Sequence, residues 1–388
     1  MQHRQHESTD QPGAHRVTLS QPVSKVGRVP DAPFPVRRDS LRQLVRQAGA
    51  GALLVTNLLN IRYLTGFTGS NAALLLDADS DERTLFCTDG RYVTQAKTEV
   101  PDLELVDDRA SAAALATRAS GRTGFESHYV SVEQYEALSG LAENAELMRT
   151  PGLVERLRLV KDEHEIAALR KACAVADAAL AALIERGGIR PGRTERDVAR
   201  DLENLMLDHG ASARSFSSIV AAGANSAIPH HRPTGAVLAP GDFLKLDFGA
   251  TVDGYHSDMT RTLVLGKAAG WQRELYELVR RAQERGSAAV RPGAVTKEVD
   301  RAAREVIEQA GHGEQFTHGL GHGVGLEIHE APSLAKKGDG TLTAGMTVTV
   351  EPGVYLAGRG GVRIEDTLVV RDTAPELLTL SGKDLVVV

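Results

Sequence analysis

The chain has 388 residues, of which 42% are hydrophobic and 25% are charged, and its formal net charge is −6. This length allows two domains with a sizeable core, and the acidic balance, without a dense stripe of Lys and Arg, argues against nucleic acid as a partner. Two cysteines are too few for a disulfide scaffold, and neither a membrane-length apolar run nor the apolar core of a secretory signal is present, so we expect a cytoplasmic protein.

The N-terminal third of the chain divides into two parts. Residues 1–34 are polar, with several prolines and scattered histidines, and this composition predicts a flexible tail. The following residues, 35–152, predict a small α/β domain. Its expected elements are a helix over residues 39–47 and strands over residues 52–56, 72–76 and 85–88.

Residues 153–187 are rich in Ala and Leu and predict a helical linker that opens a second domain, residues 153–388. An internal repeat runs through this domain. Arg-Pro-Gly occurs at residues 190–192 and again at residues 291–293, and each copy precedes a helical pattern with a candidate N-cap, Thr194 or Thr296. Because an acidic pair follows each helix at a similar distance, we expect an internal duplication.

The first acidic pair, Asp247 and Asp258, lies on two β-rich runs joined by an Asp-Gly turn signal at residues 253–254. A two-residue loop there would pair Val252 with Tyr255 and place both carboxylates on the opposite face of the hairpin. The two acids would then be diagonal neighbours, about 7–8 Å apart at the backbone. Two acids on one face repel each other unless a cation lies between them, so this hairpin predicts a metal site.

The second acidic pair, Glu351 and Glu365, follows the first by 104 and 107 residues, counted from Asp247 and Asp258. Glu351 ends an alternating run that places it on the face opposite Val350, and Glu365 ends another extended run. If the two halves of the domain face each other, the two acidic pairs meet.

A fifth donor, His322, comes from a glycine-rich run at residues 318–326. Imidazole and carboxylate donors suit manganese, iron, cobalt or zinc, and four carboxylates balance two divalent ions, an arrangement that serves hydrolysis. Any one of these residues alone would more often be an ordinary polar residue. Together they predict a site for two metal ions, formed by Asp247, Asp258, His322, Glu351 and Glu365.

Residues from about 36 to 380 resemble the Xaa-Pro aminopeptidase and prolidase branch of the pita-bread metallopeptidases, which are related to methionine aminopeptidases and creatinases. The resemblance is carried by seven short runs. They are residues 60–66 (NIRYLTG), 88–92 (TDGRY), 246–250 (LDFGA), 257–262 (SDMTRT), 321–330 (GHGVGLEIHE), 351–355 (EPGVY) and 361–366 (GVRIED). This resemblance implies an α/β (α+β) protein with a creatinase-like N-terminal domain and a duplicated pita-bread catalytic domain.

The family's metal ligands fall on the five residues named above. By this resemblance Asp247 would chelate one ion, Asp258 and Glu365 would bridge both, and His322 and Glu351 would complete the other. Glu351 would also accept a proton from the attacking water. The ions are expected to be Mn²⁺, with Co²⁺ or Zn²⁺ as alternatives.

Three further residues match catalytic positions of the family. His329 would stabilise the oxyanion, His230 would help to position the substrate, and Arg363 would lie beside the metal site. Because His231 follows His230 directly, the second of these assignments could move by one residue.

The family implies an enzyme that cleaves the Xaa-Pro bond at the N-terminus of peptides, aminopeptidase P. The alternative is a prolidase, which cleaves Xaa-Pro dipeptides and needs the same metal site. A methionine aminopeptidase fits the N-terminal domain less well, a creatinase works without metal, and a non-catalytic binding protein would have lost metal ligands. The expected partners are peptides with proline in second position and a second copy of the chain, as a homodimer or higher homo-oligomer.

Overall fold

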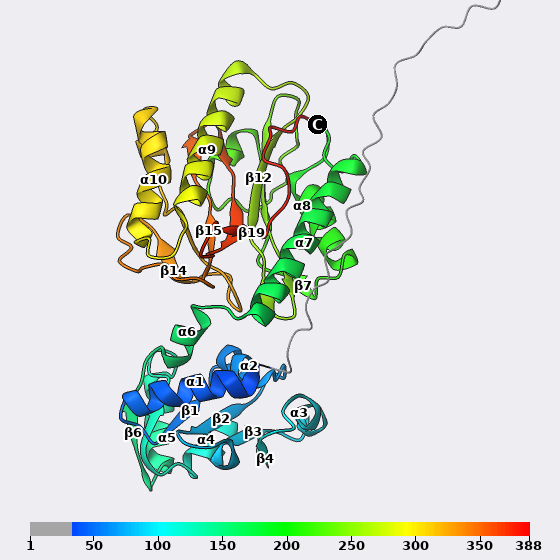
Figure 1. Cartoon of the computed structure of the whole chain (residues 1–388). Coiled ribbons are helices and arrows are strands. Elements are labelled where there is room, and N and C mark those ends of the chain that lie inside the picture. The colour runs from blue at the N-terminus through cyan, green and yellow to red at the C-terminus, as the bar shows by residue number, and fades with distance from the viewer. Residues whose placement is uncertain (1–32) are drawn as a thin grey trace, which may run out of the picture. The chain divides into compact units, whose positions relative to one another are not determined.

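The computed structural model describes residues 33–388, so the predicted tail lies outside the described residues except for its last two. The first part of the described chain is built on a six-stranded sheet in the order β4-β3-β2-β1-β5-β6, in which β2 is antiparallel to both neighbours and the other pairs are parallel (Figure 1). The strands are β1 (Ala52–Val55), β2 (Ala73–Asp77), β3 (Leu85–Thr88), β4 (Glu104–Asp107), β5 (Gly121–Phe125) and β6 (Ala145–Arg149).

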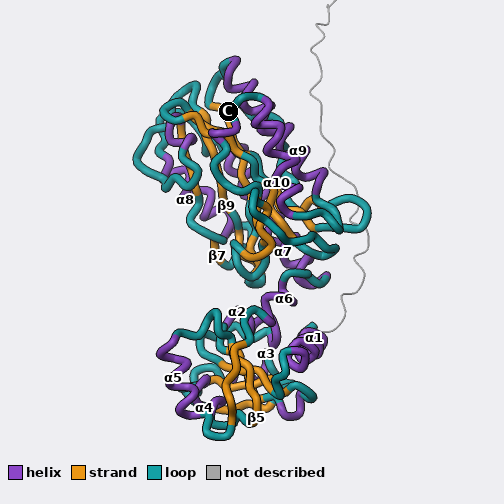
Figure 2. The backbone as a smooth tube through the Cα atoms, turned by 90° about the vertical axis from the view of Figure 1, so that its left-hand side faces the viewer, coloured by secondary structure: helices purple, strands orange, loops and turns teal. Residues whose placement is uncertain are grey.

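Helices cover both faces of this sheet (Figure 2). Leu53 and Val55 pack toward α1, whereas Leu54 between them packs toward α4 and α5, as the alternation of a strand requires. The predicted helix and three strands are confirmed, but α1 starts five residues earlier than predicted because Pro35 fits the first turn of a helix. The helices are α1 (Phe34–Gln47), α2 (Leu58–Thr65), η1 (Asp81–Arg83), α3 (Val93–Glu99), α4 (Ser111–Ala116) and α5 (Val132–Leu141).

The predicted helical linker consists of two helices, α6 (Leu153–Arg158) and α7 (Glu163–Glu185), rather than one continuous stretch. Asp162 starts α7, because its side chain accepts the Glu165 N–H while the Glu165 side chain accepts the Asp162 N–H. A residue that caps a helix has non-helical backbone angles, so the linker must break there.

Two packed halves follow α6, each a sheet covered on one side by two helices, and α7 belongs to the first of them (Figure 1). In the first half, α7 and α8 pack on the sheet β12-β9-β8, and in the second half α9 and α10 pack on the sheet β14-β13-β15-β18-β19. The elements of the first half are α8 (Glu195–Asp208), β7 (Ala213–Arg214), β8 (Ile219–Ala222), η2 (Gly223–Ala227), β9 (Phe243–Phe248), β10 (Ala250–Val252), β11 (Tyr255–His256) and β12 (Met259–Val264). Those of the second half are α9 (Gly270–Ala289), α10 (Thr296–Gln309), η3 (Gly313–Gln315), β13 (Gly321–Gly323), β14 (Glu330–Leu334), β15 (Thr347–Val350), β16 (Gly353–Leu356), β17 (Gly360–Arg363), β18 (Asp366–Val369) and β19 (Glu376–Leu377).

The internal duplication is visible in the geometry. Helices α8 and α10 each have 14 residues and begin at residues 195 and 296. Before each helix a glycine N–H donates to a leucine carbonyl, from Gly192 to Leu238 at 3.0 Å and from Gly293 to Leu342 at 2.8 Å. One predicted cap is wrong, because Val295 holds the cap position of α10 while Thr194 caps α8 as expected.

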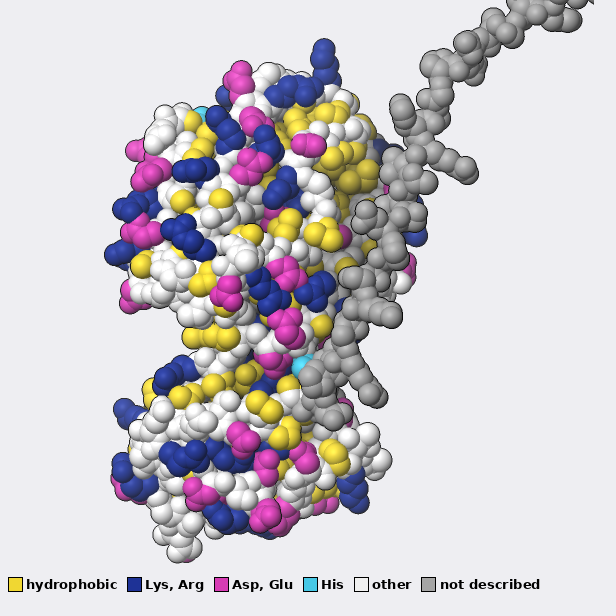
Figure 3. Space-filling model, viewed as in Figure 1, with side chains coloured by type: hydrophobic (Ala, Val, Ile, Leu, Met, Phe, Trp, Pro, Cys, Tyr) yellow, Lys and Arg dark blue, Asp and Glu magenta, His cyan; other side chains and the backbone are white. Residues whose placement is uncertain are grey.

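Acidic and basic side chains are interspersed on the face drawn in Figure 3. Within residues 33–388, no helix combines the length and the apolar character that crossing a bilayer demands.

Candidate metal centre

The first acidic pair lies on the predicted hairpin. Val252 pairs with Tyr255, and Asp247 pairs with Thr260 in the same register, so the diagonal arrangement of Asp247 and Asp258 is confirmed. The ladder is interrupted at Gly249, where an added Cβ would lie 1.8 Å from the Ser257 carbonyl oxygen. Only glycine permits this close approach to the Ser257 backbone, just before Asp258 and the start of β12.

The second acidic pair lies where one antiparallel pair of strands ends and another pair with the same register begins. Val350 pairs with Asp366 on β15 and β18, and Gly353 pairs with Arg363 on β16 and β17. Glu351 and Glu365 occupy facing positions between these pairs. The two halves meet here, because the Glu365 N–H donates to the Thr260 carbonyl at 3.1 Å.

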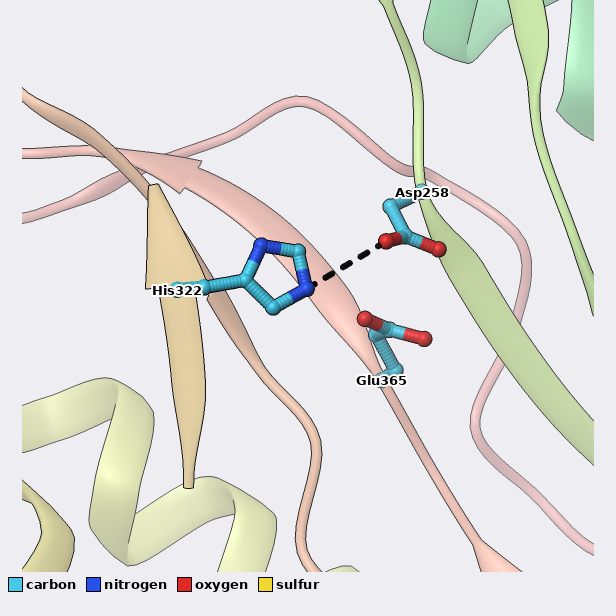
Figure 4. A group of neighbouring side chains, drawn as sticks. All are labelled: Asp258, His322 and Glu365. Carbon is cyan, nitrogen blue, oxygen red and sulfur yellow. Dashed lines mark ion pairs between the residues drawn. The ribbon is translucent and has the colours of Figure 1, made fainter. Parts of the chain in front are cut away.

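Three of the predicted ligands form a compact group, in which donor atoms of Asp258, His322 and Glu365 all lie within 4.8 Å of one another (Figure 4). The Nε2 atom of His322 lies 3.6 Å from Asp258 Oδ2 and 3.4 Å from Glu351 Oε1. The Nδ1 atom of His322 lies 3.0 Å from the Gly323 carbonyl oxygen, to which it can only donate, so Nε2 carries the free lone pair. This tautomer is the one that a metal ion needs.

The electrostatics of the group call for a cation. Burial, together with the charges of Glu365, Asp247 and Glu351, raises the pKa of Asp258 well above its usual value. Burial and the charges of Glu351 and Asp247 do the same to the pKa of Glu365. Burial lowers the pKa of His322 to about 4, so the imidazole is neutral and available as a ligand.

Asp247 is held by Arg363, a fully buried guanidinium, through an ion pair between Asp247 Oδ2 and Arg363 Nη2. The other oxygen, Asp247 Oδ1, is buried without a hydrogen-bond partner among the described residues. A buried carboxylate oxygen that lacks a donor is costly unless it binds a cation. The orphaned oxygen, the clustered acids and the neutral imidazole therefore fit divalent metal ions.

Arg363 donates three further hydrogen bonds, to Thr260 Oγ1 at 3.0 Å, Tyr355 Oη at 2.8 Å and the Pro229 carbonyl at 3.2 Å. Its side chain is therefore committed to supporting the site. Its low exposure, 2%, also leaves little of it accessible to a substrate.

The two further histidines predicted at the site, His329 and His230, are both exposed. The exposed ring of His329 lies edge-on to His322, with ring centroids 4.4 Å apart. His230 is also exposed, and burial of part of its ring and the charge of Arg363 lower its pKa. The adjacent His231 is turned away from this group, because its Nε2 lies 2.8 Å from Glu195 Oε2. Of the two neighbours, His230 is the one whose pKa responds to the charges of Arg363 and Asp247.

Sequence reasoning missed four supporting side chains. Thr260 Oγ1 donates to Glu365 Oε2 at 2.7 Å, and Thr349 Oγ1 donates to Glu351 Oε1 at 3.3 Å. Thr260 and Thr349 each lie two residues from a predicted ligand, and therefore on the same face of the chain, so the sequence could have indicated both. His318 and Tyr355 are bonded to each other, with Nε2 and Oη 2.9 Å apart, and nothing local predicts that contact across 37 residues.

Glu351 makes the stability of the metal-free protein depend on pH. Burial and the charge of Asp247 raise its pKa from 4.5 to about 7, so between these values the folded protein keeps a proton that the unfolded chain releases. This contribution to the unfolding free energy is present below the unfolded pKa and is lost as pH rises through the folded pKa. We therefore expect Glu351→Gln to gain stability relative to the parent as pH rises from about 5 to about 8.

Urea unfolding in the presence of a chelator measures this difference. His318 and His322 have lowered pKa values and act in the opposite direction, but both proteins contain them. Removing the Glu351 charge also lowers the pKa of Asp258 and Glu365, which adds to the expected gain. A difference that is flat or shrinks with rising pH would contradict the expected titration of Glu351.

Comparison with known proteins places this chain in a family. Residues 167–372 match metallopeptidase family M24, and residues 37–160 match the creatinase/prolidase N-terminal domain. The chain belongs to metallopeptidase family M24. This M24 enzyme is therefore a hydrolase that uses divalent metal, with a creatinase-like N-terminal domain and the duplicated pita-bread fold. The domain boundaries expected after residues 34 and 152 stay predictions.

Three similar proteins cover the M24 chain almost from end to end. A structure described as Xaa-Pro dipeptidase from Bacillus anthracis is 39% identical, covers 92% of this chain and 100% of its own, and superimposes with a TM-score of 0.87. The Xaa-Pro dipeptidase of Pyrococcus furiosus is 35% identical over 90% of this chain and 99% of its own length. An X-Pro aminopeptidase structure from Thermotoga maritima is 33% identical, covers 90% and 99% of the two chains, and has a TM-score of 0.82.

Proposed function

We propose that this M24 metallopeptidase is an Xaa-Pro dipeptidase, which hydrolyses dipeptides whose second residue is proline. The observation that carries the proposal is similarity along almost the whole chain to proteins named Xaa-Pro dipeptidase, together with the group of metal-type donors formed by Asp258, His322 and Glu365. This proposal replaces the first expectation from sequence, aminopeptidase P, with its stated alternative.

Aminopeptidase P keeps one specific observation in its favour, the similarity to the X-Pro aminopeptidase structure from Thermotoga maritima. Both activities cleave the same bond and need the same metal centre. The relatives named as dipeptidases, at 39% and 35% identity, favour the dipeptidase.

We assign the metal ligands to Asp247, Asp258, His322, Glu351 and Glu365. Asp247 would hold one ion, Asp258 and Glu365 would lie between the two, and His322 and Glu351 would complete the second. We expect Mn²⁺, with Co²⁺ or Zn²⁺ as alternatives, because carboxylate oxygens outnumber the single imidazole. Two such ions lower the pKa of a shared water molecule and so supply a nucleophile near neutral pH.

The side chains around the ligands would carry out the proton transfers and bind the substrate. Glu351 would accept a proton from the attacking water, because its carboxylate lies beside the other ligands, with Oε1 3.4 Å from His322 Nε2. His329 is exposed beside His322 and could donate a hydrogen bond to the developing oxyanion. His230 would orient the dipeptide, and Arg363 would hold Asp247 in place.

The test is to compare an Xaa-Pro dipeptide with the Xaa-Pro-Yaa tripeptide on Mn²⁺-loaded protein. We expect the dipeptide to have a kcat/KM at least about 100-fold higher, because a site shaped for a free carboxylate rejects a chain that continues beyond proline. An Xaa-Ala dipeptide serves as the control for proline specificity.

Each result assigns a different activity. Comparable or faster release of the first residue from the tripeptide would identify an aminopeptidase P. Failure to cleave any proline substrate, with metal bound, would overturn the proline-specific assignment. The homodimer expected from the family stays a prediction, and sedimentation of the loaded protein would measure it.

A further inference from the structure

Lys245 is a fully buried lysine on β9, two residues before Asp247, so the two side chains leave the strand on the same face. The internal repeat gives independent support, because the equivalent position of the second half also holds a supporting side chain. At the matching place of β15, two residues before Glu351, Thr349 bonds both the Glu351 carboxylate and the backbone N–H of His322. The residue at this place in the second half thus supports the metal centre directly.

The amino group of Lys245 bonds to two consecutive backbone carbonyls. Its Nζ lies 2.6 Å from the Ile228 oxygen and 3.1 Å from the Pro229 oxygen, and 5.1 Å from the centroid of the Tyr355 ring. Within residues 33–388, no carboxylate oxygen lies within 4.0 Å of this nitrogen. Burying an amine costs folding free energy. Because the Lys245 amine hydrogen-bonds, among the described residues, only to the loop of Ile228 and Pro229, we expect its role to concern a functional residue of that loop.

The loop carries His230, and it is anchored on both sides of that residue. The Pro229 carbonyl accepts a second hydrogen bond from Arg363 at 3.2 Å, which ties it to the guanidinium that holds Asp247. On the other side, His231 is bound to the buried Glu195. His230 is therefore an exposed side chain between two fixed neighbours.

We propose that Lys245 is a positioning residue, which clamps the carbonyls of Ile228 and Pro229 and so aims the His230 imidazole at the substrate. The clamp needs only two N–H groups, which a lysine has whether it is charged or neutral. The part of this inference that concerns substrate rests on the proposed dipeptidase function, whereas the clamp itself does not.

The clamp is tested first without substrate. In Lys245→Met the side chain keeps its length and loses its donors, so we expect amide hydrogen exchange of the peptide covering residues 226–232 to become at least about tenfold faster. Leu246→Met is the matched control, because Leu246 is a buried core residue on the opposite face of β9. Unchanged exchange in Lys245→Met would overturn the clamp whatever the enzyme cleaves.

The link to His230 is tested by a kinetic cycle on Mn²⁺-loaded protein of verified metal content. We expect Lys245→Met to lower kcat/KM for an Xaa-Pro dipeptide by about tenfold or more, since small misplacements of a positioned group are costly. In a His230→Ala background the same change should cost less than about twofold. Equal losses in both backgrounds would overturn the positioning role, and an inactive parent enzyme would instead overturn the proposed function.

Discussion

Replacing Asp258 with asparagine is expected to abolish turnover and to stabilise the metal-free protein at the same time. The carboxylate is buried among Glu365, Asp247 and Glu351, whose charges raise its pKa, so an amide of the same shape relieves repulsion. We expect the unfolding free energy in chelator to rise by about 1.4 kcal/mol or more, which corresponds to a single pKa unit of repulsion. Dipeptide hydrolysis should fall at least about 1000-fold, because the nucleophile depends on the ions.

Metal binding provides the second half of this test. A saturating divalent ion at 100 times its dissociation constant stabilises the parent by about 2.7 kcal/mol, and Asp258→Asn should lose most of this gain. Asp339→Asn, which changes an exposed loop acid, should leave activity, metal content and stability unchanged. If Asp258→Asn destabilises the metal-free protein, or binds Mn²⁺ at the parent stoichiometry, the proposed role of Asp258 is wrong.

Of the proposed substitutions, Arg363→Met is expected to lower the unfolding free energy of the metal-free protein the most. Its guanidinium is buried and forms an ion pair with Asp247, whose side chain is 10% exposed. Removing one partner of a buried pair leaves an uncompensated charge and typically costs about 3–5 kcal/mol. Urea unfolding of the metal-free variant at neutral pH measures this loss.

A double variant separates charge from packing. In an Asp247→Asn background, Arg363→Met should cost much less, because the unpaired carboxylate is no longer present. Arg280→Met, which removes a more exposed arginine paired with Glu277 and Glu284, should cost less than about 1 kcal/mol. A loss from Arg363→Met that is the same with and without Asp247 would show that the ion pair is not its cause.

The hairpin of Asp247 and Asp258 could be predicted from sequence because its register is a local property. An Asp-Gly turn and two alternating strands determine which side chains share a face, and the structure has the predicted pairing of Val252 with Tyr255. The break between α6 and α7 is also determined locally. Asp162 and Glu165 have the spacing of a capping pair, a signal that the prediction of one helical linker did not use.

The contacts that could not be predicted join segments far apart in the chain. Arg363 reaches Asp247 across 116 residues, and His231 reaches Glu195 across 36, so neither contact follows from a period or a turn. The choice between His230 and His231 depended on the second of these contacts. The choice between dipeptidase and aminopeptidase depends on the surroundings of the metal centre, whose ligands are common to both.

The duplication copies carboxylates between the halves but not the imidazole. Ile219 pairs with Asp247 in the first half, and the Glu351 N–H bonds to the Leu320 carbonyl in the second, so Ile219 and Leu320 are equivalent positions. Two residues further along, the first half has Ala221 where the second has His322. The approximate two-fold symmetry of the fold is therefore broken at its centre, and two ions bound there would be chemically inequivalent.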